Sequence, residues 1–90
     1  MVIFTDHARD KLLKELGKLG IREQTIIEIL RNPDEMLYDA FTNRFVIVSW
    51  SHNVAVIYEM VNDDIVVITV IYSSVLKDIV NGRRKTGRWI

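Results

Sequence analysis

The feature that most constrains this 90-residue chain is the density of β-branched side chains in its second half. Residues 45–71 contain 13 valines and isoleucines among 27 residues, and these side chains favour strands. Short polar connectors at 41–43, 51–53 and 62–64 are typical of hairpins, so neighbouring strands should run antiparallel. We expect strands over Met36–Ala40, Arg44–Trp50, Val54–Val61 and Ile65–Tyr72.

The last of these segments does not alternate between apolar and polar residues, because only Thr69 interrupts Ile65–Ile71. An antiparallel sheet with one face in water should alternate. We therefore expect both faces of the central strands to be covered. Two N-terminal helices can cover one face, which leaves a C-terminal helix or a second subunit for the other. On this ground we predict a homodimer or a bound partner.

Apolar residues at helical spacing precede the strands. Thr5 is a good N-cap for a helix over Asp6–Lys18. A second helix over Glu23–Arg31 should stop before Pro33, which disfavours helical backbone at the residue preceding it.

Ser74–Asn81 predicts a short third helix, with Gly82 as the residue that follows its end. Val2–Phe4 is a candidate for an additional short strand. The expected fold class is α+β: two N-terminal helices packed on a four-stranded antiparallel meander sheet, with a short C-terminal helix.

The composition excludes several classes of site. Cysteine is absent, so disulfides and Cys-ligated zinc or iron–sulfur sites are excluded. Two histidines, His7 and His52, are too few for a three-histidine metal site, and we expect no metal and no cofactor. The N-terminus lacks the basic and long apolar regions of a secretory signal, and no apolar run is long enough for a membrane span. A cytoplasmic protein without membrane contact is the expectation.

The formal net charge of zero divides unevenly along the chain. Residues 1–80 hold 8 basic and 12 acidic side chains, a balance of −4, and residues 81–90 hold four basic and no acidic ones. We expect a single domain over 1–82 and a basic tail over 83–90. Guanidinium groups beside Trp89 suit nucleic acid, since cations hold phosphates and an indole stacks on a base. The alternative is a solvated terminus without a ligand.

A second group of cations lies on the first predicted helix. His7, Lys11, Lys14 and Lys18 follow one another at i, i+4, i+7 and i+11, which places them on one stripe. The stripe is either a phosphate-contacting ridge or an ordinary solvated face, since acidic residues flank it.

Arg9 projects into the apolar sector of the same helix and needs a carboxylate partner there. Glu59 is the first candidate and Asp39 the second; an anion-binding role for Arg9 is the alternative. At the ends of two predicted strands, Arg44 and Tyr72 are candidates for the same rim as the basic tail.

Three short motifs resemble a known family. They are Thr5-x-His7-Ala8-x-x-x-Leu12, then Gly20-Ile21, then Asn32-Pro33. This order is similar to that of an uncharacterised small-domain family with the pattern T-x-H-A, R-G-I, L-x-x-P, allied to the RelE/BrnT-like toxins. The resemblance implies the compact RelE-like toxin fold, mRNA endonuclease activity and a cognate antitoxin protein.

The chain departs from the BrnT-like pattern at two places. Those proteins have Lys-His-Gly before the second helix, where this chain has Lys18-Leu19-Gly20. They also have Ile-Ser-Ala-Arg after the last strand, where this chain has Ile71-Tyr72-Ser73-Ser74, so a serine occupies the arginine position.

Two functional hypotheses follow. In the first, the chain is a metal-independent endoribonuclease of a toxin–antitoxin system, with His7 or Tyr72 for proton transfer and Arg44, Arg83 and Arg84 for charge stabilisation. The predicted nucleic-acid contacts are Lys11, Lys14, Lys18, Lys85, Arg88 and Trp89. In the second, the chain is a non-catalytic RNA- or protein-binding module that keeps the toxin fold. A plain homodimer without a ligand is a third possibility.

Overall fold

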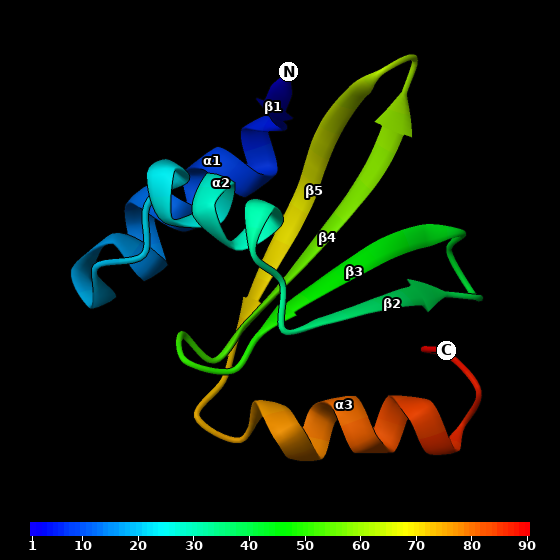
Figure 1. Ribbon diagram of the computed structural model, residues 1–90. Helices are drawn as coiled ribbons and strands as arrows, with labels where there is room; N and C mark the ends of the chain where they lie inside the picture. Colours follow the sequence, from blue (N-terminus) through cyan, green and yellow to red (C-terminus); the bar gives the residue numbers. More distant parts are fainter.

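A five-stranded mixed sheet forms the centre of the computed structural model, which describes residues 1–90 (Figure 1). The strand order is β1-β5-β4-β3-β2, with β1 parallel to β5 and all other neighbours antiparallel. The strands are β1 Val2–Phe4, β2 Glu35–Asp39, β3 Arg44–Ser49, β4 Val54–Val61 and β5 Asp64–Tyr72. The general α+β class is confirmed.

The predicted sheet of four antiparallel strands is wrong in one respect, because β1 adds a fifth strand in parallel to β5. Val2 lies opposite Ile65 and Phe4 opposite Val67, and the Thr5 N–H continues the ladder to the Val67 carbonyl at 3.1 Å. This pairing satisfies backbone groups that the edge of β5 would otherwise leave open.

Three helical regions accompany the sheet. The first is α1, Asp6–Lys11, which continues through a π-helical turn at Leu12–Leu16 and a 3₁₀ turn at Gly17–Leu19. As predicted, the Thr5 side chain caps α1 by accepting from the Ala8 N–H at 3.1 Å. The others are α2, Glu23–Arg31, and α3, Leu76–Lys85. None of the helices has the length and apolar character needed to cross a membrane.

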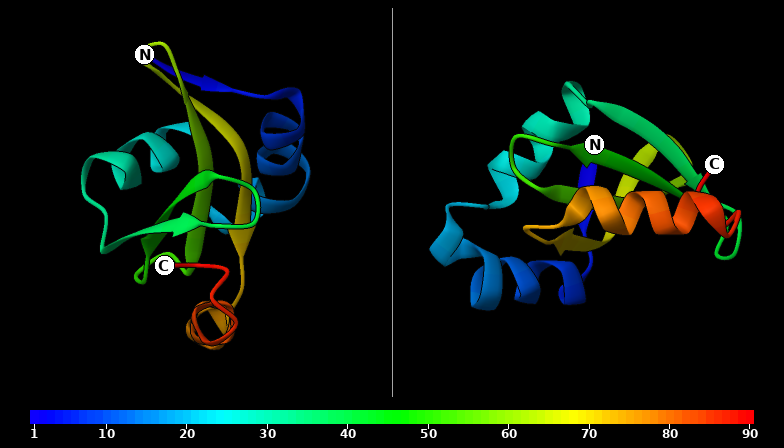
Figure 2. Two further views of the ribbon diagram at one scale, coloured as in Figure 1. Left: turned by 90° about the vertical axis from the view of Figure 1, so that its right-hand side faces the viewer. Right: turned by 90° about the horizontal axis from the view of Figure 1, so that it is seen from below.

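One face of the sheet is covered by α1, the turns after it and α2 (Figures 1 and 2). Helical and strand side chains interdigitate there in a core of 13 buried residues. The helical segments contribute Ala8, Leu12, Leu16, Ile26 and Ile29, the loop before α2 contributes Ile21, and the strands contribute Phe4, Ile47, Val54, Val56, Tyr58, Val67 and Val70.

The opposite face is covered by α3 and by Trp89, which follows it (Figure 2). This second core has eight buried residues: Leu37, Val46, Val48, Ala55, Ile57, Leu76, Val80 and Trp89. Both faces are therefore covered, as the uninterrupted apolar strand predicts. Because α3 of the same chain supplies the second cover, the strand pattern no longer requires a second subunit, and the homodimer stays a prediction.

The end of α3 differs from the expectation. Gly82 lies inside α3, and the helix continues to Lys85. The chain reverses at Gly87, whose φ of +75° is a conformation that glycine adopts without strain. The helix extends past Gly82 because Arg83 and Arg84, in its last turn, have contacts with the rest of the domain.

Residues 88–90 return to the sheet and pair with β2. The Tyr38 N–H donates to the Ile90 carbonyl and the Ile90 N–H to the Tyr38 carbonyl, both at 2.9 Å. The Ala40 N–H donates to the Arg88 carbonyl at 2.7 Å. The expected boundary after residue 82 therefore does not separate a tail from the domain: the last residues complete its second layer.

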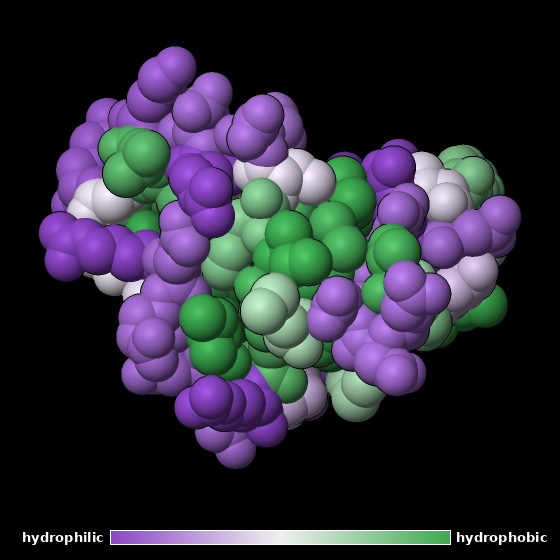
Figure 3. Space-filling model, turned by 90° about the horizontal axis from the view of Figure 1, so that it is seen from above, coloured by the Kyte–Doolittle hydropathy of each residue, from purple (hydrophilic) through white to green (hydrophobic).

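The sheet face that α1 and α2 cover keeps some apolar surface exposed. The register places Met36, Phe45 and Met60 on this face, and all three remain exposed. The Phe45 ring stacks on Tyr58 at a centroid distance of 5.3 Å and meets Tyr38 edge to face at 5.5 Å. Seen from the side of α1 and α2, apolar residues gather in a hollow between the helices and the strands (Figure 3).

Trp89 should account for a large part of the stability of the second layer. We expect Trp89→Ala to lower the free energy of unfolding by about 3 to 5 kcal/mol, because the indole is 1% exposed and its removal leaves a cavity. Urea denaturation measures the difference. The control is Ile90→Ala, whose side chain is 68% exposed and whose backbone pairing is unchanged. Equal stability of the two variants would contradict the assigned role of Trp89.

Candidate functional site

A small cleft of about 160 Å³ opens where the end of α3 meets the exposed end of the second sheet face. We call it the arginine cleft. Three of its lining residues are arginines, one is a carboxylate, two are threonines and two are apolar. They are Asp39, Thr42, Arg44, Ile57, Thr69, Ile71, Arg83 and Arg88.

The sheet register explains why residues far apart in the sequence meet here. Asp39 at the end of β2 lies opposite Arg44 at the start of β3. Thr69 of β5 lies opposite Ile57 of β4, next to a register shift at Ile57/Tyr58. These side chains share the face that α3 covers, and α3 adds Arg83 to them.

Asp39 organises the cleft, although it is almost fully buried. Its Oδ1 accepts the N–H groups of Phe41 and Thr42 at 2.9 and 3.1 Å. Its Oδ2 accepts from Arg88 Nε and from the Trp89 indole Nε1, both at 3.2 Å. Burial by itself raises the pKa of Asp39, but these four hydrogen bonds favour the carboxylate and hold its pKa below the ordinary value of 3.8.

Arg83 is held in a different way. Its guanidinium carbon lies 4.6 Å from the centre of the Trp89 ring, a cation–π contact. No carboxylate oxygen lies within 4.0 Å of it, in contrast to Arg44 and Arg88. Burial first, and then repulsion from Arg88, lower the pKa of Arg83, while Asp39 acts in the opposite direction. The group stays cationic at neutral pH, since guanidinium does not lose its proton in proteins.

The other two guanidinium groups of the cleft are paired. Arg44 Nε bonds to Glu59 Oε1 at 2.9 Å, and Arg88 Nε bonds to Asp39 Oδ2 at 3.2 Å. Arg83 is therefore the cation of the cleft whose donors are free for a ligand.

The pairing of Arg44 with Glu59 also corrects the predicted partner of Arg9. Arg9 instead bonds through Nε to Glu23 Oε2 at 3.0 Å, and its side chain is half exposed. It lies on the surface between α1 and α2, where a salt bridge in water replaces the buried pair that the apolar sector suggested.

His7 lies at the border of the cleft. Its Nε2 is 3.1 Å from Thr69 Oγ1, and Thr69 lines the cleft. The N-terminus of α1 is anchored nearby, because Thr5 Oγ1 donates to the Ile68 carbonyl at 3.0 Å. The structure thus brings Arg44, Arg83 and Arg88 into one cleft, and His7 contacts that cleft through Thr69.

Two predicted catalytic residues do not join them. Tyr72 lies opposite Val54, which belongs to the core between the sheet and the α1 and α2 layer. The Tyr72 side chain is therefore on the other face of the sheet from Ile71, which lines the cleft. Arg84 forms a salt bridge with Glu35 of β2, on another flank of α3. The expected placement of both residues beside the other arginines is wrong, because side-chain direction depends on strand alternation and helix rotation.

The predicted nucleic-acid contacts are also dispersed. Lys11 and Lys14 share a shallow depression with His7, but Asp10 and Glu15 line it too, and Lys14 Nζ is 3.9 Å from Asp10 Oδ2. Lys18 lines a different depression, between the turns after α1 and the start of α2. Lys85 is exposed at the end of α3.

Trp89 is the clearest correction among the predicted contacts. Its ring is buried between Arg83, Asp39 and the second core, so it cannot stack on a base. Its role is to position Arg83 and to donate a hydrogen bond to Asp39.

Sequence reasoning missed Asp39 and Thr69 as parts of the site. Thr69 carries a signal, since it is the one polar residue within Ile65–Ile71. Asp39 carries none that is specific, because its importance comes from the return of residues 88–90 to β2.

The arrangement suits the binding of one phosphate group. It offers a free guanidinium, two further guanidinium groups and threonine hydroxyls, with an imidazole at its border. No group of three or more His, Cys, Asp or Glu residues that could hold a metal ion is present.

The lowered pKa of Asp39 makes a prediction about pH. A carboxyl group whose pKa is lower in the folded state stabilises the fold above its unfolded value of 3.8, and this stabilisation is lost as the pH falls through the folded value. We expect Asp39→Asn to lower the free energy of unfolding at pH 7 by about 2 kcal/mol, through weaker hydrogen bonds to Arg88 and Trp89.

The difference between Asp39→Asn and the unchanged chain should narrow below about pH 4, as measured by urea denaturation across the acid range. Asp63→Asn, in the exposed turn between β4 and β5, is the matched control. A difference that stays constant down to pH 2 would show that the charge of Asp39 does not stabilise the fold through its bonds to Arg88 and Trp89.

Comparisons with protein-family models, with curated proteins and with solved structures found no match to this chain. The residues of the arginine cleft and their geometry are therefore the basis for assigning a function.

Proposed function

We propose that this chain is a toxin-like endoribonuclease that binds RNA in the arginine cleft and needs no metal for cleavage. The observation that carries the proposal is Arg83: a guanidinium without a carboxylate partner, oriented by Trp89 and flanked by two other arginines. A cation fixed in this way is ready to bind an RNA phosphate without first breaking a salt bridge.

The proposed reaction uses the RNA's own 2′-hydroxyl as nucleophile. His7 accepts the 2′-hydroxyl proton through Nδ1 as the 2′-oxygen bonds to phosphorus, and Thr69 orients the imidazole through its 3.1 Å contact with Nε2. Arg83 and Arg44 stabilise the negative charge that develops on the phosphorane oxygens. The bond to the 5′-oxygen then breaks, and that oxygen takes a proton from the imidazolium or from water. The products are a 2′,3′-cyclic phosphate and a free 5′-hydroxyl.

A non-catalytic RNA- or protein-binding module with the same fold is the second candidate. It is favoured by the salt bridges of Arg44 with Glu59 and Arg88 with Asp39, which leave one guanidinium free where charge stabilisation in a nuclease would use several. His7 is also the one imidazole at the cleft, so a reaction that needs a second group for proton transfer to the 5′-oxygen would have to use water.

RNA is the proposed partner of the nuclease, and RNA or a protein is the proposed partner of the binding module. A cognate antitoxin protein stays a prediction from the family resemblance, and a homodimer stays a prediction that the strand pattern does not require. Growth arrest on expression, relieved by a co-expressed neighbouring gene, would support the toxin–antitoxin role.

A neighbouring arginine serves to distinguish a specific contribution of Arg83 to RNA affinity from the effect of removing any one positive charge. We expect Arg83→Gln to weaken binding of single-stranded RNA about tenfold, because a charge-assisted hydrogen bond to phosphate is lost. The slope of log affinity against log salt concentration should become shallower by about 0.7, the value for one phosphate contact. Arg84→Gln removes the same charge from a residue bonded to Glu35 and is the matched control.

Fluorescence anisotropy with a labelled oligonucleotide, at several salt concentrations, measures both quantities. Equal losses in Arg83→Gln and Arg84→Gln would place RNA outside the arginine cleft.

The catalytic role of His7 has its own test. We expect His7→Ala to reduce the rate of RNA cleavage in the presence of EDTA by about 10²- to 10⁴-fold, the usual contribution of a general base, with RNA affinity unchanged. His52→Ala, in the turn between β3 and β4, is the control. Loss of cleavage in EDTA for the unchanged chain would contradict the metal-independent reaction, and full activity of His7→Ala would remove His7 from it.

A further inference from the structure

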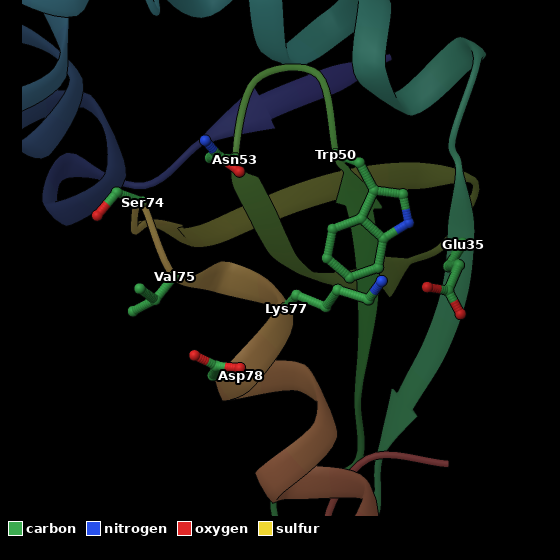
Figure 4. A pocket seen from close by; sticks show the side chains of 7 residues that line it. All are labelled: Glu35, Trp50, Asn53, Ser74, Val75, Lys77 and Asp78. Atoms are coloured by element: carbon green, nitrogen blue, oxygen red, sulfur yellow. The ribbon is translucent and has the colours of Figure 1, made fainter.

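A larger cavity of about 600 Å³ lies at the other end of α3, near its first turn (Figure 4). It is formed by the turn between β3 and β4, the start of β2 and the segment that leads into α3. Its lining residues are Glu35, Trp50, Asn53, Ser74, Val75, Lys77 and Asp78. The volume is within the range of cavities that hold small ligands.

Trp50 forms an aromatic wall of this cavity. Its ring is partly buried against the second core, and the other side faces the cavity beside Lys77 (Figure 4). The backbone fixes its position, because the Trp50 N–H donates to Asp34 Oδ2 at 2.7 Å and its carbonyl accepts from the Asn53 N–H at 3.2 Å. These two hydrogen bonds fix the backbone of Trp50, and its indole lines the cavity.

The charged groups of the cavity divide into paired and unpaired ones. Glu35 is bonded to Arg84. Lys77 and Asp78 take part in none of the salt bridges of the structure. The cavity is therefore lined by a free ammonium beside the indole and by a free carboxylate on the side of Val75 (Figure 4). Both lie in the first turn of α3, which fixes their backbone positions.

A flat ring with acceptors on one edge and N–H donors on another matches this set. Guanine has such edges: O6 and N7 accept hydrogen bonds, and the N1–H and the N2 amino group donate them. Lys77 can donate to the first edge, Asp78 can accept from the second, and the ring can stack on Trp50. Adenine presents an amino group where guanine has O6, which opposes the Lys77 ammonium.

We propose that the cavity at Trp50 is a binding site for a guanine base of the RNA. This inference rests on the proposed RNA function and adds a base preference to it. Lys77 and Arg83 are six residues apart on α3, about 9 Å along the helix axis. That span is short enough for neighbouring nucleotides of one strand to reach the base site and the arginine cleft together.

Tryptophan fluorescence offers a direct test, because the chain has two tryptophans and Trp89 is buried. Titration with guanosine 5′-monophosphate should quench the Trp50 emission. Adenosine, cytidine and uridine 5′-monophosphates should bind at least about fivefold more weakly, since each lacks one of the guanine edges. Equal binding of the four nucleotides would overturn the guanine preference.

Variants assign the binding to this cavity. By calorimetry, Trp50→Ala should lose about tenfold or more of the affinity for guanosine 5′-monophosphate, as expected for loss of base stacking. Asp78→Ala, at an exposed helix position, should weaken guanosine binding without affecting folding, and Asp63→Ala in the distant β4–β5 turn should not. Unchanged affinity in Asp78→Ala and Trp50→Ala would overturn the site.

The failure of this site and the failure of the ribonuclease proposal are distinguishable. Nucleotide binding at Trp50 in a chain that neither binds nor cleaves RNA would overturn the proposed function and leave the guanine site in place. RNA cleavage that depends on Arg83, together with no guanosine binding, would overturn the base site alone.

Discussion

The contact between Asp39 and Trp89 is the interaction on which the second layer of the structure depends. It joins residues 50 positions apart, through the indole N–H and an antiparallel bridge between their backbones. α3 is ten residues long and buries Leu76 and Val80, which is too little for an independent helix. Trp89 supplies the remaining buried surface, and it also supports the Arg83 guanidinium. The packing of α3 and the geometry of the arginine cleft therefore have one cause.

Local sequence signals predicted the elements well. The bounds of α2, Glu23–Arg31, and of β4, Val54–Val61, agree with the expectation because Pro33 and the polar turns act within a few residues. Asn43, Asn53 and Asn62 all adopt positive φ in the turns between strands, which asparagine tolerates. The parallel pairing of β1 with β5 and the return of residues 88–90 to β2 were beyond such signals. Both depend on contacts between distant segments.

The candidate site shows the same division. Charge counting identified Arg83 and Arg88, and strand position identified Arg44, and all three line the cleft. Which arginine is free could not be predicted, since that depends on Glu59, Asp39 and Glu35 reaching three different guanidinium groups. The sequence predicts that Trp89 stacks on a base, and the structure buries it in the second core instead, for the same reason. A sequence with an aromatic residue among arginines looks the same whether the ring faces a base or the core. The hydrogen bond to Asp39 and the burial of the ring show that Trp89 faces the core.

The uneven charge of the chain acquires a structural meaning from these pairs. Four cations end a chain whose first 80 residues carry a balance of −4, and two of these cations, Arg84 and Arg88, bond to carboxylates of β2. Part of the C-terminal positive charge therefore forms salt bridges within the molecule, which attach α3 and the last residues to the sheet. Arg83 forms no such salt bridge. Its guanidinium instead stacks on the ring of Trp89, six residues later in the chain, and lines the cleft. A residue buried in the second core thus leaves a cation without a carboxylate partner, so the packing of α3 and the position of Arg83 depend on one side chain.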